Sequence, residues 1–512
     1  MRELSLTKSL GCDAEGWGFY MSESVIQGRE LIGKVDEHLW PLIADNECTP
    51  KHVSPAGLIT HNRLDLAIKI LFLEMKSYSS DFARDIYESH LRCFSLGRFQ
   101  EPGNEDKNSL ERYIEDFEGL YESLRRAPFD SDKSYVPLAA DGSILNGAHR
   151  VAAGYVTGRS VVTVSMLTPP PDYGYKFFLS RGMRPRDVEI AVSKFVEIAE
   201  NVYIAILWPS SNKKSIPIDT TFGRVIYEKK VKLTYRGAHN LITQVYANEH
   251  WLGKEEEHYR GAEGKLAPCF GNGEDLRVVA FQAESIEQVT KIKTKVREMV
   301  GIGKHSIHIT DTHEEAVRVS RLLFNENAVH FLNHSFPTKF PETHCALESF
   351  RQRLSLESMG MNRFVIDSGL VLALYGLRKA RDIDVIALET HSFRNDGIDD
   401  HDSEMRFHGV SKSELILNPK YYFFYRGIKF SAFRQVYRMK AARREEKDLV
   451  DIEMMAALVE GGVFNALVAQ VKKEMLFARA RARKQIVEAL KCVGLYRKAR
   501  TIYRRLKGRD DD

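Results

Sequence analysis

Two aspartates, Asp382 and Asp384, are separated by a single residue. Their side-chain type and their spacing suit metal binding and catalysis better than those of other residues in this chain. The apolar residues around them predict a β-strand, on which side chains repeat with a period of two, so both carboxylates are expected on one face. Carboxylates on one face can hold Mg²⁺ or Mn²⁺, ions that bind oxygen ligands and are often shared with substrate phosphates. The pair is therefore predicted to be metal-binding and catalytic, with a nucleotide or another phosphoester as substrate.

A small-residue turn, Ser368 and Gly369, lies ahead of the aspartates and is followed by a short predicted helix over residues 370–377. Small side chains let the backbone N–H groups at the start of this helix approach a phosphate, assisted by the partial positive charge of a helix N-terminus. Arg378 follows the predicted helix, and Lys447 lies further along the chain. One of these two cations is predicted to neutralise the charge that develops during phosphoryl transfer.

The order of these motifs resembles the nucleotidyltransferase fold, including its branch of LicD/fukutin-type phosphotransferases, over residues 342–460. In that fold a small-residue turn, a helix ending in Gly-x-Arg and an Asp-x-Asp strand follow one another, as Ser368, Gly376–Arg378 and Asp382 do here. The resemblance implies a mixed sheet and a third carboxylate on a later strand. The candidate for that strand, residues 421–430, contains no acidic residue.

Downstream, Lys447, Asp448 and Asp451 resemble a Lys-Asp-x-x-Asp helix that often follows in the same fold. The resemblance leaves two interpretations of these charges. They either face the bound nucleotide or form the solvent-exposed side of a helix.

A second candidate site lies upstream, in residues 135–154. This segment predicts a strand, a tight turn at Asp141 and Gly142, a second strand and the start of a helix, because Asp-Gly is a hairpin turn signal. The run 159–165 is predicted to form the next strand.

Four residues at the start of this upstream helix, Asn146, Gly147, His149 and Arg150, resemble the Gly-x-His-Arg turn of the ParB/sulfiredoxin fold, which cradles nucleotide phosphates in several branches. The chemistry agrees, because Arg150 could bind phosphate bidentately, His149 could donate a hydrogen bond and Gly147 lets the backbone come close. The alternative is a hairpin followed by a buried structural pair of His149 and Arg150.

The chain has 512 residues, which is enough for about three domains that each bury a core. With 43% hydrophobic and 28% charged residues, it has an ordinary globular composition. The expected class is multidomain, α/β and α+β. The predicted divisions are a helical lead-in plus the ParB/sulfiredoxin-like domain at 1–170, a central α/β domain at 173–340, a nucleotidyltransferase-like domain at 341–465 and a basic helical tail at 466–512.

Several features predict a cytoplasmic location. The six cysteines show no Cys-x-x-Cys spacing, which favours a reducing compartment, and no apolar leader or membrane-spanning run is evident. The net charge of +4 by itself favours neither nucleic acid nor membrane. From Lys472 onward, however, basic residues predict a cationic amphipathic helix that could lie on an anionic membrane, bind nucleic acid or pack on the protein itself.

The leading hypothesis is a Mg²⁺-dependent nucleotidyl- or phosphotransferase that uses a nucleotide or a nucleotide-activated sugar. The order of modules resembles bacterial proteins associated with capsule or lipopolysaccharide biosynthesis, which implies a glycolipid acceptor at the inner membrane surface and a peripheral role for the tail. A ParB-like, DNA-associated nucleotide-binding protein is one alternative, although nucleic acid is not the expected partner because no helix-turn-helix is evident. A toxin-like nucleotidyltransferase that modifies protein or RNA and a non-catalytic scaffold are the others.

Overall fold

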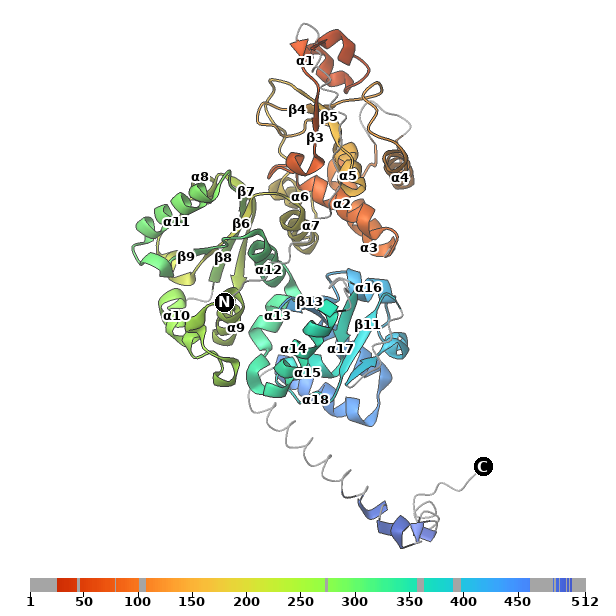
Figure 1. Cartoon of the computed structure of the whole chain (residues 1–512), viewed down its shortest axis with the longest axis vertical. Coiled ribbons are helices and arrows are strands. Elements are labelled where there is room, and N and C mark those ends of the chain that lie inside the picture. The colour runs from red at the N-terminus through yellow and green to blue at the C-terminus, as the bar shows by residue number, and fades with distance from the viewer. Residues whose placement is uncertain are drawn as a thin grey trace, which may run out of the picture. The chain divides into compact units, whose positions relative to one another are not determined.

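The computed structural model describes residues 25–43, 47–78, 80–100, 107–271, 275–356, 363–389, 397–460 and parts of 482–499. These residues form a mixed α/β structure with several small sheets, as expected (Figure 1). The chain divides into two compact units, and both are discontinuous in sequence. The first unit contains Met1–Leu58 and Leu120–Pro171, and the second contains Ile59–Gly119 and Asp172–Asp512.

This division differs from the predicted continuous domain at 1–170. The end of the first unit at Pro171 lies next to the predicted boundary at 170, but helix α2 (Leu64–Met75) belongs to the second unit. Ten consecutive residues of α2 are buried, so the helix needs partners on more than one side. It finds them in α3 (Ser80–Ser95) and in α7 (Pro185–Ile198).

The first unit is built around a three-stranded sheet in the order β3 (Lys51–Val53), β5 (Val161–Ser165), β4 (Val136–Leu138). Strands β4 and β5 are parallel and are connected through α5 (Ala148–Thr157). The expected second strand of the hairpin is reduced to a single bridge between Ile144 and Leu138. Smaller elements of this unit are β1 (Ile26–Gln27), α1 (Trp40–Ile43) and β2 (Glu47–Cys48), and α4 (Leu110–Arg126) passes from the second unit into the first.

The second unit contains an antiparallel sheet in the order β7 (Arg224–Lys232), β8 (Asp275–Gln282), β6 (Val202–Leu207), β9 (Ile307–Ile309). Strands β8 and β9 run in one direction and are connected by α11 (Ile286–Val300), with β6 between them, which is a split βαβ arrangement. Side chains of α8 (Ile218–Phe222) and α11 form the core on one face of this sheet. The remaining helices around it are α6 (Tyr175–Ser180), α9 (Tyr235–Val245), α10 (Gly261–Phe270), α12 (His313–Leu323) and α13 (Glu326–His334).

A second, mixed sheet of the same unit has the order β12 (Ile398–Asp400), β11 (Ile383–Ala387), β10 (Phe364–Asp367), β14 (Ile428–Ser431), β13 (Tyr422–Tyr425). Strand β10 is antiparallel to β11 and parallel to β14. Alternate residues of β10 and β11 contribute to two hydrophobic clusters, because side chains on a strand point to opposite faces. Helices α14 (Pro341–Leu356), α15 (Gly369–Leu374) and α18 (Glu446–Glu460) lie with one cluster, and α16 (Lys412–Leu417) lies with the other.

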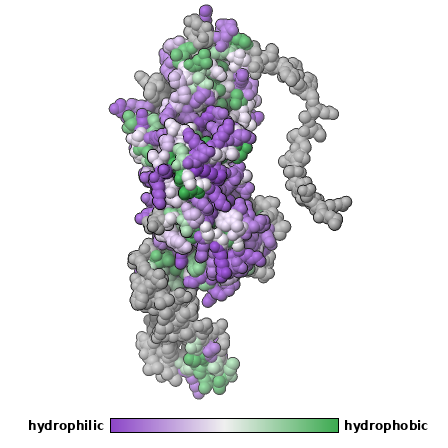
Figure 2. Space-filling model, turned by 90° about the vertical axis from the view of Figure 1, so that its left-hand side faces the viewer, coloured by the Kyte–Doolittle hydropathy of each residue, from purple (hydrophilic) through white to green (hydrophobic). Residues whose placement is uncertain are grey.

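The surface of the described residues carries hydrophobic side chains scattered among hydrophilic ones on the face shown in Figure 2. None of the helices in the described part of the chain is both long and apolar enough to cross a membrane. The predicted basic tail lies almost entirely outside the described residues.

Candidate functional site

The turn between β10 and α15 has a strained backbone. Ser368 is buried and adopts φ 52° and ψ −111°, a conformation that residues other than glycine rarely occupy. Such strain persists only where the surrounding structure enforces it, and it is concentrated at functional sites. The predicted small-residue turn is therefore present, and Ser368 is its constrained residue.

The two aspartates lie beside this turn. Asp384 is on β11, whereas Asp382 directly precedes the strand, so only one of the pair occupies the strand position expected. The backbone N–H of Gly369 donates a hydrogen bond to Oδ2 of Asp384 at 3.3 Å. The turn and the carboxylate pair are therefore neighbours.

A pocket of about 470 Å³ brings the predicted C-terminal site residues together. Six cationic side chains and three carboxylates line it, so its walls carry an excess of positive charge that suits an anionic ligand. The lining residues are Phe340, Ser368, Gly369, Leu377, Arg378, Lys379, Arg381, Asp382, Asp384, His401, Lys440, Arg443, Lys447 and Asp451.

The carboxylates of Asp382 and Asp384 are suited to a cation. Within the described residues, no cationic side chain lies within ion-pair distance of either one. Burial, together with the nearby carboxylates of Asp382 and Asp367, raises the pKa of Asp384, and it outweighs the opposite effects of His401 and of the N–H of Gly369. No group of three His, Cys, Asp or Glu side chains among the described residues has the arrangement of a complete metal site. A cation here would take the two aspartates as protein ligands and its remaining ligands from water and substrate, which is a common arrangement for Mg²⁺.

Arg378 is held in place by Asp451. Its Nε and Nη2 donate to the two carboxylate oxygens at 2.7 and 2.9 Å, and Nη1 donates to the carbonyl of Lys379 at 3.1 Å. Burial disfavours the charged guanidinium, but Asp451 outweighs this effect, so the pKa of Arg378 is raised. Arg378 also lies about 3.7 Å from the position that a Cβ on Gly369 would occupy, which places its positive charge next to the turn.

The two aspartates of the Lys-Asp-x-x-Asp helix do not form the solvent-exposed side of a helix. Asp448 and Asp451 are buried, and Lys440 contacts both of them at 3.0 Å. Arg443 also pairs with Asp448, at 2.9 Å. Lys447 instead is largely exposed, pairs with Glu445 at 3.0 Å and lines the pocket. The aspartates therefore fix the cations of the pocket wall, and the lysine faces the pocket.

A buried hydrogen-bond chain at this site was missed by sequence reasoning. Asp367 lies directly opposite Asp384 in the β10–β11 pair, so the two side chains share one face of the sheet. Its Oδ2 contacts Nδ1 of His401 at 3.1 Å and Nε2 of His408 at 3.2 Å. The side-chain amide of Gln435 donates to the backbone carbonyl of His408 at 2.7 Å and lies 3.3 Å from its Nδ1.

The hydrogen-bond chain shifts the pKa values of Asp367 and His401. Burial would raise the pKa of Asp367, but His408 and His401 outweigh it and hold that pKa well below its usual value. Burial would lower the pKa of His401, but Asp367 raises it. The only local sequence signal was an acidic residue immediately before Ser368, at the end of an apolar strand.

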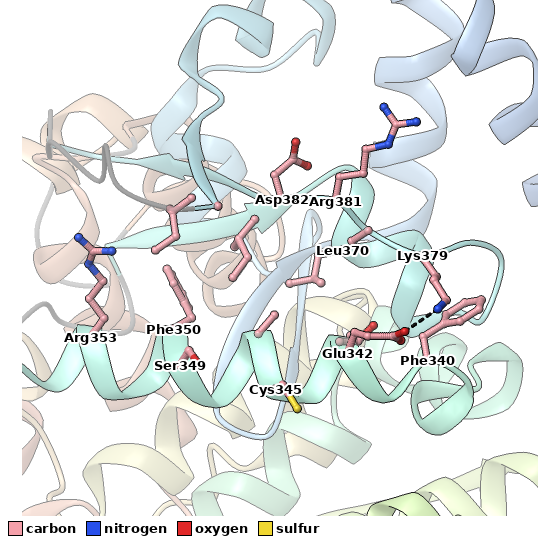
Figure 3. A pocket seen from close by; sticks show the side chains of 16 residues that line it. Phe340, Glu342, Cys345, Ser349, Phe350, Arg353, Leu370, Lys379, Arg381 and Asp382 are labelled. Carbon is pink, nitrogen blue, oxygen red and sulfur yellow. Dashed lines mark hydrogen bonds and ion pairs between the residues drawn. The ribbon is translucent and has the colours of Figure 1, made fainter. Parts of the chain in front are cut away.

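A second pocket, of about 490 Å³, adjoins the first and shares Phe340, Lys379, Arg381 and Asp382 with it. Figure 3 shows α14, with Phe350 and Arg353, along one side of this second pocket and Asp382 on the other side. Its lining combines apolar side chains with charged groups at both ends. Asp382 therefore lies where the cation-lined pocket and a more apolar pocket meet.

The upstream motif belongs to the first unit, whereas the aspartate pair belongs to the second. Gly147 precedes α5 with φ +86°, and a Cβ there would lie 3.0 Å from the guanidinium of Arg150. The guanidinium of Arg150 donates to the carbonyl of Tyr135 at 2.9 Å, which gives it a structural role. The side chain of Asn146 accepts a hydrogen bond from the N–H of Gly147, and His149 is half-buried on the first turn of α5. Phosphate binding by this motif stays a prediction.

Comparison with known proteins found no matching family model, no matching curated protein and no matching solved structure.

Proposed function

We propose that the second unit is a nucleotidyl- or phosphotransferase that depends on Mg²⁺ or Mn²⁺ and acts on a nucleotide or a nucleotide-activated substrate. One observation carries this proposal: the strained turn, two aspartates without a cationic partner among the described residues and an excess of cations line a single pocket of about 470 Å³. Anionic phosphates and a divalent cation together would satisfy both kinds of charge in this pocket.

In this proposal Asp382 and Asp384 hold the cation, which supplies charge neutralisation at the phosphate oxygens when it is bound. Arg378 and Lys447 bind the phosphates, and Arg378 does so from a fixed position because Asp451 accepts from its Nε and Nη2 and the carbonyl of Lys379 accepts from its Nη1. The N–H of Gly369 adds a backbone donor at the turn.

His401 is the candidate general base. Asp367 holds its Nδ1, which leaves Nε2 as the ring nitrogen that could take a proton from an acceptor hydroxyl. The raised pKa of His401 makes it a stronger base than an ordinary histidine. The pocket of Figure 3 would hold the part of a substrate that lies away from the phosphates.

The test is metal-dependent nucleotide binding by the full chain, measured by calorimetry with nucleoside triphosphates and nucleotide-activated sugars in the presence of Mg²⁺ or EDTA. Asp382→Asn/Asp384→Asn preserves side-chain size but removes both charges, so we expect metal-dependent affinity to fall at least about tenfold. Asp130→Asn/Asp132→Asn is the matched control, because these exposed aspartates have the same spacing and lie in the first unit. Equal binding by the two double variants would overturn the proposal.

A further inference from the structure

A third pocket of the second unit, of about 220 Å³, lies outside the candidate transferase site and is lined by cations from three segments. Arg186 comes from α7, Lys420 from the segment before β13, and Arg434 and Arg438 from α17 (Phe433–Arg443). Glu326, at the start of α13, is the one acidic side chain in the described lining. The pocket therefore concentrates positive charge in a small volume.

These four cations have no ionic partner in the described part of the chain. No carboxylate there lies within 4.0 Å of their charged groups, and this includes Glu326. The Nε of Arg186 is buried without a hydrogen-bond partner among the described residues. Arg434 and Arg438 are spaced i, i+4 on one helix, where like charges repel each other. The side chains of Arg434 and Arg438 are exposed to solvent. A bound anion would give the buried Nε of Arg186 a partner and would reduce the repulsion between Arg434 and Arg438.

The walls of this pocket are held by specific hydrogen bonds. The side-chain amide of Asn327 donates to the carbonyls of Pro419 and Lys420 at 3.1 and 3.2 Å. The side-chain amide of Asn325 also donates to the carbonyl of Pro419, at 3.3 Å. These bonds fix the backbone of the segment that carries Lys420, so this wall of the pocket is formed before any ligand binds.

One lining residue connects this pocket with the transferase pocket. Gln435 is buried, and it contacts His408, which contacts Asp367, which in turn holds His401. His401 lines the transferase pocket. Opposite ends of α17 also contribute to the two pockets, because Arg434 lines one and Lys440 and Arg443 line the other.

We propose that this pocket, which we call the arginine pocket, binds a small phosphate-bearing anion the size of pyrophosphate and that its occupation is transmitted to His401 through Gln435. Guanidinium groups bind phosphate oxygens with strong, charge-assisted hydrogen bonds, and the volume of the pocket suits a di- or triphosphate group. Binding at the arginine pocket does not depend on the proposed function; the effect on a transferase reaction does.

The first test is titration of the full chain with sodium pyrophosphate in EDTA, measured by calorimetry. Arg434→Gln/Arg438→Gln should weaken pyrophosphate binding at least about tenfold, because two charge-assisted contacts are lost. Lys291→Gln/Lys295→Gln is the matched control, because these lysines are exposed, have the same i, i+4 spacing and lie on α11. Pyrophosphate affinity equal to that of the wild type in the arginine variant would refute the site.

The second test follows the imidazole signal of His401 by NMR with ¹³C-labelled histidine, assigned through His401→Gln. Pyrophosphate should shift this signal in the wild type and in Lys447→Gln, in which the transferase pocket is altered, but not in Arg434→Gln/Arg438→Gln. If the shift persists in the arginine variant, it arises at the transferase pocket and the connection through Gln435 is wrong. Neither readout requires catalysis, so failure of the arginine pocket and failure of the proposed function are distinguishable.

Discussion

At the scale of single residues, the buried ion pairs of α18 give the strongest test of the site's construction. Asp451 is 2% exposed and neutralises both Arg378 and Lys440. Removing one partner of a buried pair leaves an uncompensated charge, which costs about 3–5 kcal/mol.

Asp451→Ala is therefore expected to lower the free energy of unfolding by about 3 kcal/mol or more, as measured by urea denaturation. Lys447→Ala, on the same helix, is the control: its side chain is exposed, and its loss should change stability by less than about 1 kcal/mol. Comparable losses for the two variants would contradict the assignment of Asp451 to the buried network.

The raised pKa of Asp384 predicts how metal affinity depends on pH. A carboxyl group with a raised pKa takes up a proton at a higher pH than an ordinary aspartate, and the protonated form cannot bind a cation. Mn²⁺ affinity, followed by electron paramagnetic resonance, should therefore decline as the pH falls through a midpoint above the usual aspartate value of about 4. A midpoint at or below that value would show that Asp384 is not a ligand.

In the absence of metal, lowering the pH has the opposite effect at Asp384: its raised pKa favours the folded state at low pH. Because folding raises the pKa of Asp384, its contribution to stability is present at low pH and is lost as the pH rises through the folded-state value. His401 behaves in the same direction, since its folded pKa is also raised, so its contribution is complete below the ordinary histidine pKa and is lost at higher pH.

Residues joined by a short motif could be predicted from the sequence. Ser368, Gly369, Asp382 and Asp384 lie within a short stretch of chain, and their order indicated a shared pocket that the structure contains. The contacts of Asp367 with His401 and His408 could not be predicted in this way, because they depend on the pairing of β10 with β11 and on the path of the segment after β12.

At the scale of elements, the start of α5 depends on the backbone freedom of glycine. Gly147 has φ +86°, and a Cβ there would press on the guanidinium of Arg150. Gly147→Ala should therefore destabilise the first unit by about 1–2 kcal/mol, measured by thermal unfolding. Gly57→Ala in the same unit is the control, because nothing lies within 4 Å of its Cβ position and its φ is not positive. An equal effect of both substitutions would show that the conformation at Gly147 is not required.

Elements with a strong local pattern appeared close to their predicted positions. The run at 159–165 contains β5, and residues 64–75, within the predicted helical lead-in, form α2. The partners of these elements were not predictable, because α2 packs on α7, more than a hundred residues later in the chain. The insertion of β6 between β8 and β9 likewise depends on pairing between distant segments.

At the scale of the whole molecule, two units with separate cores should unfold in separable steps. Differential scanning calorimetry is therefore expected to show two transitions. Gly147→Ala should lower the midpoint of one transition, and Asp451→Ala should lower that of the other. A single transition shifted by both variants would mean that the units unfold cooperatively.

The position of α2 also bears on how the chain folds as a ribosome makes it. The helix is buried over ten consecutive residues, yet one of its partners, α7, ends only at Ile198. At about 5–20 residues per second, synthesis from Met75 to Ile198 takes roughly 6–25 s. During this interval the apolar surface that α7 later covers has no native partner, so α2 presents to the cell the kind of surface that chaperones bind.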